Sequence, residues 1–336
     1  MSQTILVTGA TGFVGSHFVD YLIEKKLTTK IYCTKRWHHS RLDHVSSFIS
    51  KVEFVDCDLT EASSVRKILN DIRPDKIFHF AAESFVSPSW AHPTLYMRHN
   101  FDATVNILEA IRELKLKSRI HIPGSGEEYG DVPESDLPIT TKTPLRPVNP
   151  YAVSKIAQDL IGLTYFESYG IEVIRTRAFN HEGPRRDRVF GMPSYAYQLA
   201  LIKKKIRDQK IIYTGELDDK RNFTHVKDMV EAYWLASEFC DPGELYLIGT
   251  EAEQNVATFR DVLSRLITYA GIENPKIEQL KKYTRPTAVP FLIFADTKFF
   301  EKTAWSPKLT LDEIIKDTFE YWMNKNELEG LDNGTY

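Results

Sequence analysis

Short apolar runs alternate with helical patterns along the first half of the chain. Residues 4–8 (TILVT) form an apolar, β-branched run of the kind expected for a buried strand. Residues 13–26 then repeat apolar side chains on one helical face. Further strands are expected at 30–34, 52–57, 76–81, 119–122 and 172–176, and further helices at 61–72, 104–114 and 151–169. This alternation predicts an α/β fold in which a doubly wound parallel sheet is covered by helices on both faces.

The pattern changes beyond residue 178. Residues 180–194 are rich in Gly, Pro and Arg, which is typical of a functional loop. The remainder mixes expected helices at 227–239 and 258–270 with short strands at 211–214 and 245–248, and it predicts a smaller mixed α/β lobe. We therefore expect a dinucleotide-binding and catalytic domain over 1–178. A mainly substrate-binding lobe is expected over 179–330, with segments at about 211–240 returning to the core.

Composition and charge restrict the classes of binding partner that we expect. The 336 residues are 42% hydrophobic and carry a net charge of −3, so neither nucleic acid nor membrane is an expected partner. No apolar run approaches the roughly 18 residues of a membrane helix, and the start leaves no room for a secretory signal. The cysteines lack CxxC spacing, and His38, His39 and His79 lack partner ligands at useful spacing. We expect a cytoplasmic protein without a metal site.

A glycine-rich turn joins the first expected strand to the first helix. It reads Gly9-Ala-Thr-Gly12-Phe-Val-Gly15. Gly9 permits the tight turn, Gly12 lets the backbone approach a pyrophosphate, and Gly15 allows close packing of the helix. The helix N-terminus adds partial positive charge for the phosphates. The turn therefore predicts a Rossmann-type fold that binds a nicotinamide dinucleotide.

Residues after the next strands complete the expected cofactor site. Arg36 follows the second strand, where it suits the 2′-phosphate of NADP better than the ribose of NAD. Asp58 follows the third strand, and small side chains from Ala81 follow the fourth. Open α/β sheets bind ligands at these carboxyl ends. The expected cofactor-binding residues here are Gly9, Thr11, Gly12, Phe13, Val14, Gly15, Arg36, Asp58, Leu59, Ala81, Ala82 and Ser84.

Three residues suggest a proton relay. Ser125 ends the fifth strand, and Tyr151 and Lys155 lie four apart on one face of a helix. A lysine ammonium beside a phenol lowers the phenol pKa, and a serine hydroxyl can orient the same substrate oxygen. The trio can remove the proton of a sugar alcohol while hydride leaves its carbon for the nicotinamide.

These motifs resemble those of the extended short-chain dehydrogenases/reductases that act on nucleotide sugars. The resemblance rests on the GxxGxxG turn, on Ser125 before Tyr129-Gly130, and on Tyr151 with Lys155. It covers nearly the whole chain. Within that family the stretches most similar to GDP-mannose 4,6-dehydratases are 82–86, 179–186, 215–228 and 285–289, followed by Asp296 and Trp305.

The resemblance implies roles for further residues. Glu127 is implied as the base at C5 that passes its proton to the departing C6 hydroxyl, so that NADP is recycled in place. His181 and Arg186 are implied to reach the cofactor, together with Tyr151 and Lys155. The expected substrate-binding residues are Ser84, Glu127, Asn180, Arg185, Arg221 and Arg285, the last two suited to a diphosphate. Helices 104–114 and 151–169 commonly pair between subunits in this family, which implies a homodimer or homotetramer.

The same sequence features are compatible with other functions. The run Gly126-Glu127-Glu128 is also similar to GDP-4-keto-6-deoxymannose reductases, which use the same Ser, Tyr and Lys but consume NADPH. Trp37 stands where a second arginine is expected, and Leu95 where the dehydratases have a cofactor-contacting tyrosine. A reductase or epimerase is therefore the alternative enzyme. A non-catalytic NADP-binding sensor is a third possibility, but such a protein needs no proton relay.

Overall fold

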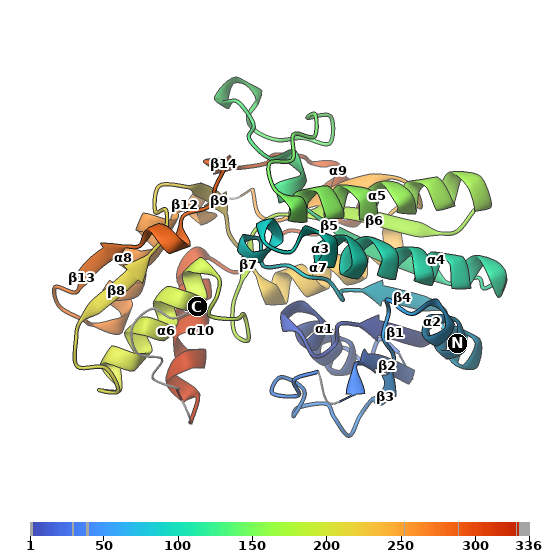
Figure 1. Cartoon of the computed structure of the whole chain (residues 1–336), viewed down its shortest axis with the longest axis horizontal. Coiled ribbons are helices and arrows are strands. Elements are labelled where there is room, and N and C mark those ends of the chain that lie inside the picture. Colours follow the sequence, from blue (N-terminus) through green and yellow to red (C-terminus); the bar gives the residue numbers. More distant parts are fainter. Residues whose placement is uncertain are drawn as a thin grey trace.

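The core of the protein is one parallel sheet. The computed structural model describes residues 3–28, 30–37, 40–251, 253–287, 289–326 and 328. The sheet has seven strands in the order β11-β6-β5-β4-β1-β2-β3 (Figure 1). Their bounds are β1 Thr4–Thr8, β2 Lys30–Lys35, β3 Glu53–Asp56, β4 Lys76–His79, β5 Arg119–Ser125, β6 Val173–Ala178 and β11 Leu245–Ile248. The predicted Rossmann-type, doubly wound sheet is confirmed.

Helices cover both faces of this sheet. The helices α1 (Phe13–Glu24) and α7 (Val226–Phe239) share one hydrophobic cluster with the strands β1 and β4. The helices α2 (Ala62–Ile72), α4 (Ala103–Glu113) and α5 (Pro150–Tyr169) form a second cluster on the opposite face. The apolar runs of the strands are thus buried from both sides, as expected for a parallel sheet.

One expected placement is wrong. Strand β11 was expected in the smaller lobe, but it pairs with β6 at the edge of the main sheet, with Leu245 opposite Arg175. Strand β8 (Ile211–Thr214), at the start of the segment expected to return to the core, pairs instead with β13 (Lys276–Gln279) in the lobe. The stretch that returns to the sheet therefore runs from α7 to β11. A four-residue apolar run carries no information about which sheet it joins.

The lobe packs three helices around a core of its own at the left of Figure 1. These helices are α6 (Gly191–Lys203), α8 (Phe259–Ala270) and α10 (Leu311–Asn324). The lobe strands, besides β8 and β13, are β9 Lys220–Asn222, β12 Val256–Thr258 and β14 Phe291–Leu292. The pair β7 (His181–Glu182) and β10 (Thr224–His225) lies where the lobe meets the sheet.

Short helices occupy several connections. They are the 3-10 turns Ser87–Trp90, Gly126–Tyr129, Glu134–Asp136, Glu253–Asn255 and Lys281–Tyr283, the π-helix Met97–Asp102, and the helices α3 (Pro93–Tyr96) and α9 (Lys298–Thr303). No helix in the described part of the chain has the length and apolar character needed to cross a membrane. His38 and His39 lie outside the described residues.

We predict that Gly9→Ala destabilises the protein by about 2–4 kcal/mol. Gly9 has φ +67°, and a Cβ there would lie 2.6 Å from the backbone nitrogen of Ala81. The strained φ costs roughly 1–2 kcal/mol and the overlap roughly as much again. Gly170→Ala is the matched control, because Gly170 has φ +68° but nothing within 4 Å of the added Cβ. Urea unfolding measures the free energy of unfolding of both variants. Equal losses in the two would show that the close approach of Gly9 to Ala81 contributes nothing.

Candidate active site

The glycine-rich turn lies against the loop that follows β4. The Gly12 amide donates to the Gly9 carbonyl at 2.9 Å, and the Ala81 amide donates to the Thr8 hydroxyl at 3.2 Å. A Cβ on Gly15 would lie 2.2 Å from the Gly9 oxygen, so α1 can approach the turn only with glycine there. Gly12 caps α1 without a side chain. The amides of the first helical turn are therefore available to an anion, which fits the pyrophosphate of a dinucleotide.

The residues expected around the adenosine part lie at the ends of β2 and β3. Arg36 is exposed, whereas its neighbour Lys35 is paired with Asp56 at 2.5 Å. Asp58 accepts hydrogen bonds from the amide and hydroxyl of Thr60 at 3.0 and 2.8 Å. Burial opposes ionisation of Asp58, but these bonds and the nearby Arg36 leave its pKa below the ordinary value. Leu59 is buried beside it.

An asparagine that the sequence analysis did not single out fixes the loop after β4. Asn100 lies in the π-helix and is fully buried. Its amide oxygen accepts from Glu83 N at 2.7 Å, and its nitrogen donates to Glu83 O at 3.1 Å and to the Ser154 hydroxyl at 2.9 Å. The flanking Ala82 and Ser84 are exposed. Asn100 thus ties this loop to α5. It lies before the helix that was expected at 104–114, and a single polar residue there gave no signal of that role.

The relay residues come together between β5 and α5. Ser125 ends β5, and Tyr151 lies in the first turn of α5, where Asn149 caps the helix by accepting from Ala152 N at 2.7 Å. A hydrogen bond joins the Ser125 and Tyr151 side chains. Lys155 is buried one helical turn later and donates to the Pro123 carbonyl of β5 at 2.6 Å. Tyr151 and Lys155 therefore face the strand that carries Ser125.

The pKa of Tyr151 departs from the expectation. A lysine ammonium was expected to lower it, but burial raises the Tyr151 pKa well above its ordinary value, and the Ser125 hydrogen bond opposes this only in part. Lys155 instead bonds Pro123 and Gln158. Burial lowers the pKa of Lys155 to about 8. The loss of hydration on burial dominates the Tyr151 pKa and favours the neutral phenol in the absence of substrate, so Tyr151 must give up its proton before it can act as the base.

Glu127 lies beside the relay and is held by two donors. Arg285 Nη1 donates to Oε1 at 3.0 Å, and Asn149 Nδ2 donates to Oε2 at 3.1 Å. Burial alone would raise the Glu127 pKa, but Arg285 and Arg221 together outweigh it and leave the pKa below its ordinary value. Glu127 is therefore an ionised, nearly buried carboxylate, as a base requires. Asn149 was missed, although an Asn before Pro-Tyr at a helix start is a recognisable cap.

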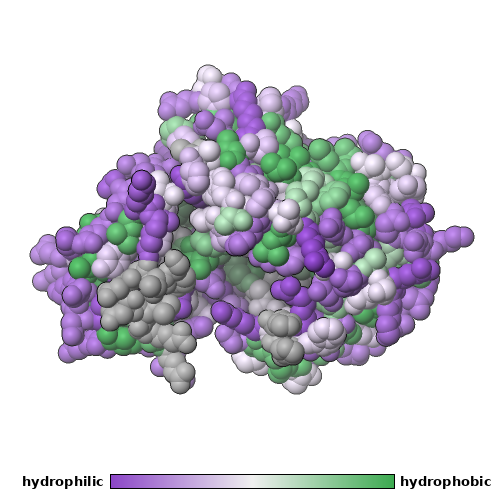
Figure 2. All heavy atoms as spheres, in the orientation of Figure 1, coloured by the Kyte–Doolittle hydropathy of each residue, from purple (hydrophilic) through white to green (hydrophobic). Residues whose placement is uncertain are grey.

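The lobe contributes charged residues to the same place. Arg221 is 2% exposed and pairs with Asp219 at 3.2 Å. Together with Glu127 and Arg285 they place two guanidinium groups and two carboxylates in one cluster. The structure thus brings together Arg221 and Arg285, both expected to bind substrate, and adds Asp219, which the sequence analysis did not single out. Figure 2 shows the surface hollowed between the lobe and the sheet.

The loop after β6 returns to the glycine-rich turn. The His181 ring stacks on Phe13, with centroids 5.9 Å apart, and the Arg186 guanidinium lies 5.2 Å from the same ring. Both therefore lie at the expected cofactor position. Asn180 is half-buried, and its carbonyl accepts from Thr224 N at 2.9 Å. Arg185 instead pairs with Asp20 of α1 at 2.7 Å, so the structure does not bring it to the Arg221 and Arg285 cluster.

The sheet, the glycine-rich turn and the Ser125–Tyr151–Lys155 relay define an extended short-chain dehydrogenase/reductase. A family model described as GDP-mannose 4,6 dehydratase matches residues 6–318, and the chain belongs to that family. A GDP-mannose 4,6-dehydratase from Vibrio cholerae is 30% identical over 94% of this chain and 93% of its own. The resemblance found in the sequence is confirmed, and the dehydratase interpretation is favoured over the reductase.

Solved structures agree on the fold. A dTDP-glucose 4,6-dehydratase from Bacillus anthracis, solved in complex with NAD, has a TM-score of 0.83 at 26% identity and covers 97% of this chain and 98% of its own. RMD from Pseudomonas aeruginosa, solved with NADPH, has a TM-score of 0.80 at 24% identity and covers 96% of this chain and 99% of its own. Both neighbours were solved with a nicotinamide cofactor, which is NAD in the first and NADPH in the second.

We predict that Arg285→Met raises the pKa of Glu127 and changes the pH dependence of stability. A carboxylate whose folded pKa is depressed stabilises the fold above its unfolded pKa, and this stabilisation is lost as the pH falls through the folded pKa. Without Arg285, burial is less opposed, so the acid-side loss should begin at higher pH. At neutral pH the variant should lose about 1–3 kcal/mol.

Urea unfolding between about pH 3 and about pH 7 measures both effects. Arg146→Met is the control, because the Arg146–Asp136 pair is exposed and should contribute less than about 1 kcal/mol. In the double variant Arg285→Met with Glu127→Gln, the additional acid-side loss should disappear. An unchanged pH dependence in Arg285→Met would contradict the electrostatic role of the arginine.

Proposed function

We propose that this protein is an NADP-dependent lyase that converts GDP-mannose, or a closely related GDP-sugar, to the GDP-4-keto-6-deoxy sugar. The observation that carries the proposal is Glu127, an ionised carboxylate two residues after Ser125, held by Arg285 and Asn149. A ketone reductase or an epimerase that uses the same relay needs no base at C5. Membership of the GDP-mannose 4,6-dehydratase family supports the same substrate.

The side chains have distinct parts in this reaction. The Ser125 hydroxyl orients the C4 oxygen, and Tyr151 accepts its proton, with Lys155 supplying positive charge on the same helix face. When bound, NADP supplies a hydride acceptor at C4 and returns the hydride at C6. The C4 carbonyl acidifies the C5 hydrogen, so the Glu127 carboxylate can remove it. Glu127 then delivers that proton to the C6 hydroxyl, which leaves as water. After the hydride returns to C6, C5 takes up a proton, which balances the one that Tyr151 accepted from the C4 hydroxyl and releases again.

The substrate's diphosphate is the natural partner of Arg221 and Arg285. Guanidinium groups bind phosphate oxygens through paired hydrogen bonds. Both arginines belong to the lobe and lie close to Glu127, which follows β5. Asn180 is assigned to the sugar-phosphate side, and Ser84 to the junction of sugar and cofactor. Arg185 loses this assignment, because its pairing with Asp20 supports a structural role beside α1.

NADP is preferred over NAD because of Arg36. This guanidinium is exposed just after β2, where a 2′-phosphate would lie, while Lys35 is already paired with Asp56. His181 and Arg186, stacked around Phe13, complete the cofactor side.

We assign 1–178 to cofactor binding and catalysis and 179–330 mainly to substrate binding, with α7 and β11 belonging to the sheet. Three free, buried cysteines fit a cytoplasmic location.

Self-association is supported by the outer face of α5. Val153 and Leu160, two helical turns apart on one face of this helix, are 47% and 44% exposed. Figure 2 shows apolar residues gathered over the region of α5. Because burying apolar surface drives association, we assign this face to contact with a second copy of the chain in a homodimer or homotetramer.

Incubation of the purified protein with GDP-mannose, without added cofactor, tests the proposed reaction. We expect NMR to show a C6 methyl group in the product, and we expect the denatured protein to release NADP. Glu127→Gln should reduce turnover by about 10²–10⁴-fold, the usual contribution of a positioned base. Glu134→Gln is the control, because Glu134 is exposed and lies outside the site.

Two outcomes would count against the dehydratase. Absence of a 4-keto-6-deoxy product from protein that retains NADP would exclude it. Reduction of GDP-4-keto-6-deoxymannose by NADPH that survives in Glu127→Gln would identify a reductase instead. Release of NAD rather than NADP would contradict the assignment of Arg36.

We predict that Leu160→Glu converts the oligomer to a monomer in sedimentation velocity. A carboxylate in an apolar contact is costly to bury, so the contact between copies should be lost. Phe300→Glu is the matched control, because Phe300 is 55% exposed on α9, outside the proposed contact. A wild-type monomer, or an oligomer that survives Leu160→Glu, would refute the assignment of this face.

A further inference from the structure

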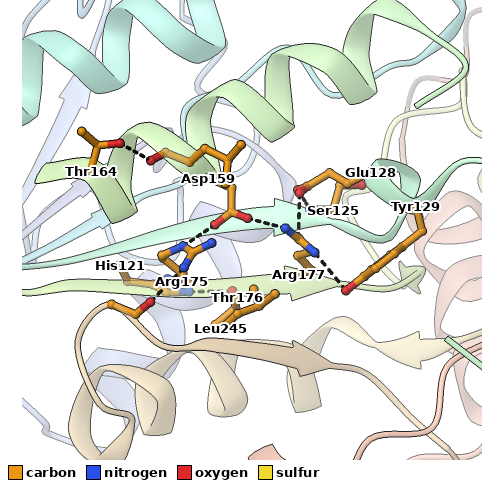
Figure 3. A network of polar contacts seen from close by, with 12 residues as sticks. His121, Ser125, Glu128, Tyr129, Asp159, Thr164, Arg175, Thr176, Arg177 and Leu245 are labelled. Atoms are coloured by element: carbon orange, nitrogen blue, oxygen red, sulfur yellow. Dashed lines mark hydrogen bonds and ion pairs between the residues drawn. The ribbon is translucent and has the colours of Figure 1, made fainter. Parts of the chain in front are cut away.

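Behind the relay lies a group of buried charges that the proposed reaction does not use. Arg177 of β6 pairs through Nε with Glu128 at 2.7 Å and through Nη2 with Asp159 at 2.6 Å. Asp159 also pairs with Arg175 at 2.6 Å. These four side chains, at most 7% exposed, form what we call the buried charge network. Figure 3 shows that it joins β6, α5 and the turn after β5.

The network reaches the active site first at Ser125. Glu128 Oε1 accepts from the Ser125 backbone amide at 2.7 Å, while its other carboxylate oxygen is paired with Arg177. A Cβ on Gly124 would lie 2.5 Å from Glu128 Oε1, so glycine is needed for the carboxylate to lie there. The Ser125 hydroxyl in turn accepts from Glu127 N at 3.2 Å. The position of both Ser125 and Glu127 therefore depends on a carboxylate anchored to β6.

The network reaches the site a second time at Lys155. Asp159 follows Lys155 by one helical turn on α5, and Lys155 itself donates to Pro123 O at 2.6 Å and to Gln158. Burial lowers the pKa of Lys155 to about 8, and the charges of Glu128 and Asp159 both act in the opposite direction. The two carboxylates of the network therefore favour the ammonium form of a lysine that burial disfavours. Because burial also raises the pKa of Glu128 to about 7, against the opposing charge of Arg177, Glu128 contributes most above that pH.

The other groups around Lys155 cannot take over this role. His79 on β4 and His121 on β5 are uncharged, because burial lowers the pKa of each to about 3. The remaining ionisable neighbours, on α5 and β6, are the protonated phenol of Tyr151 and the guanidinium groups of Arg175 and Arg177. Guanidinium groups keep their protons. If one carboxylate were neutralised, three buried cations would face a single anion, and Lys155 is the cation that can lose its proton.

We propose that Glu128 and Asp159 are positioning residues for the Ser125–Tyr151–Lys155 relay: through Arg177 they fix the main chain at Ser125, and together they hold Lys155 as an ammonium. The proposal rests on the proposed function, because the relay is the unit that they position. Neither carboxylate is among the proposed substrate contacts. Glu128 acts on the main chain of Ser125, and Asp159 acts on its own helix and on β6.

Carbon NMR of the full chain labelled with carbon-13 at lysine Cε tests the charge part directly, with Lys155→Met to assign the resonance. In Glu128→Gln and in Asp159→Asn the Lys155 pKa should fall by about one unit or more. Glu238→Gln is the matched control, because Glu238 pairs with Lys76 at the start of β4, and it should leave Lys155 unchanged. If one variant does not fold, the other carries the test. An unchanged Lys155 pKa overturns the proposal.

Kinetics separate the two contacts. In Glu128→Gln the amide oxygen can still accept from Ser125 N, so kcat should persist at low pH while the alkaline limb of the pH profile moves down with the Lys155 pKa. Glu128→Ala also removes the acceptor, and its kcat should fall further by about tenfold. A uniform loss at every pH, or equal kcat in the Gln and Ala variants, overturns the positioning role. If the wild type does not turn over GDP-mannose, the proposed function fails, but the lysine titration remains readable.

Discussion

The ion pairs of Arg177 with Glu128 and Asp159 are the constraint on which the rest of the site depends. Three buried charges lose their hydration on folding, and only close pairing makes that loss tolerable. The pairs join β6 to the turn after β5 and to α5, the elements that carry Ser125, Glu127, Tyr151 and Lys155. Removing one partner would leave an unpaired buried charge, so the three elements are held in one relative position.

The site itself is built from two parts of the chain. The sheet supplies the glycine-rich turn and the relay at the carboxyl ends of β1, β4 and β5, which is where parallel sheets present their loops. The lobe supplies Arg221 and Arg285. Arg285 donates to Glu127, and Asn149 does so from the start of α5. The ionised state of Glu127 is thus a property of the assembled protein, since burial alone would favour its neutral form.

This division explains what the sequence could predict. The strands, the glycine-rich turn and the spacing of Tyr151 and Lys155 are set by local periodicity and turn chemistry, so they are visible in one stretch of sequence. Helix α6 was missed because it is buried on nearly all sides and has no polar face. The placement of β11 depends on its pairing with β6 at Arg175, and the placement of Arg185 depends on Asp20; both partners lie far away along the chain. The raised pKa of Tyr151 depends on burial, which spacing does not show.

Gly126 bears on the reaction class in a way that only the structure shows. The run Gly126-Glu127-Glu128 is also similar to the GDP-4-keto-6-deoxymannose reductases, so glycine at this position favoured a reductase in the sequence analysis. A Cβ on Gly126 would lie 3.1 Å from the ring of Phe179, which stacks on Phe294 with centroids 4.2 Å apart. A polar side chain would therefore meet packed aromatic rings. Glycine at this position is explained by the packing behind the turn, so it does not count against the proposal that Glu127 is the base.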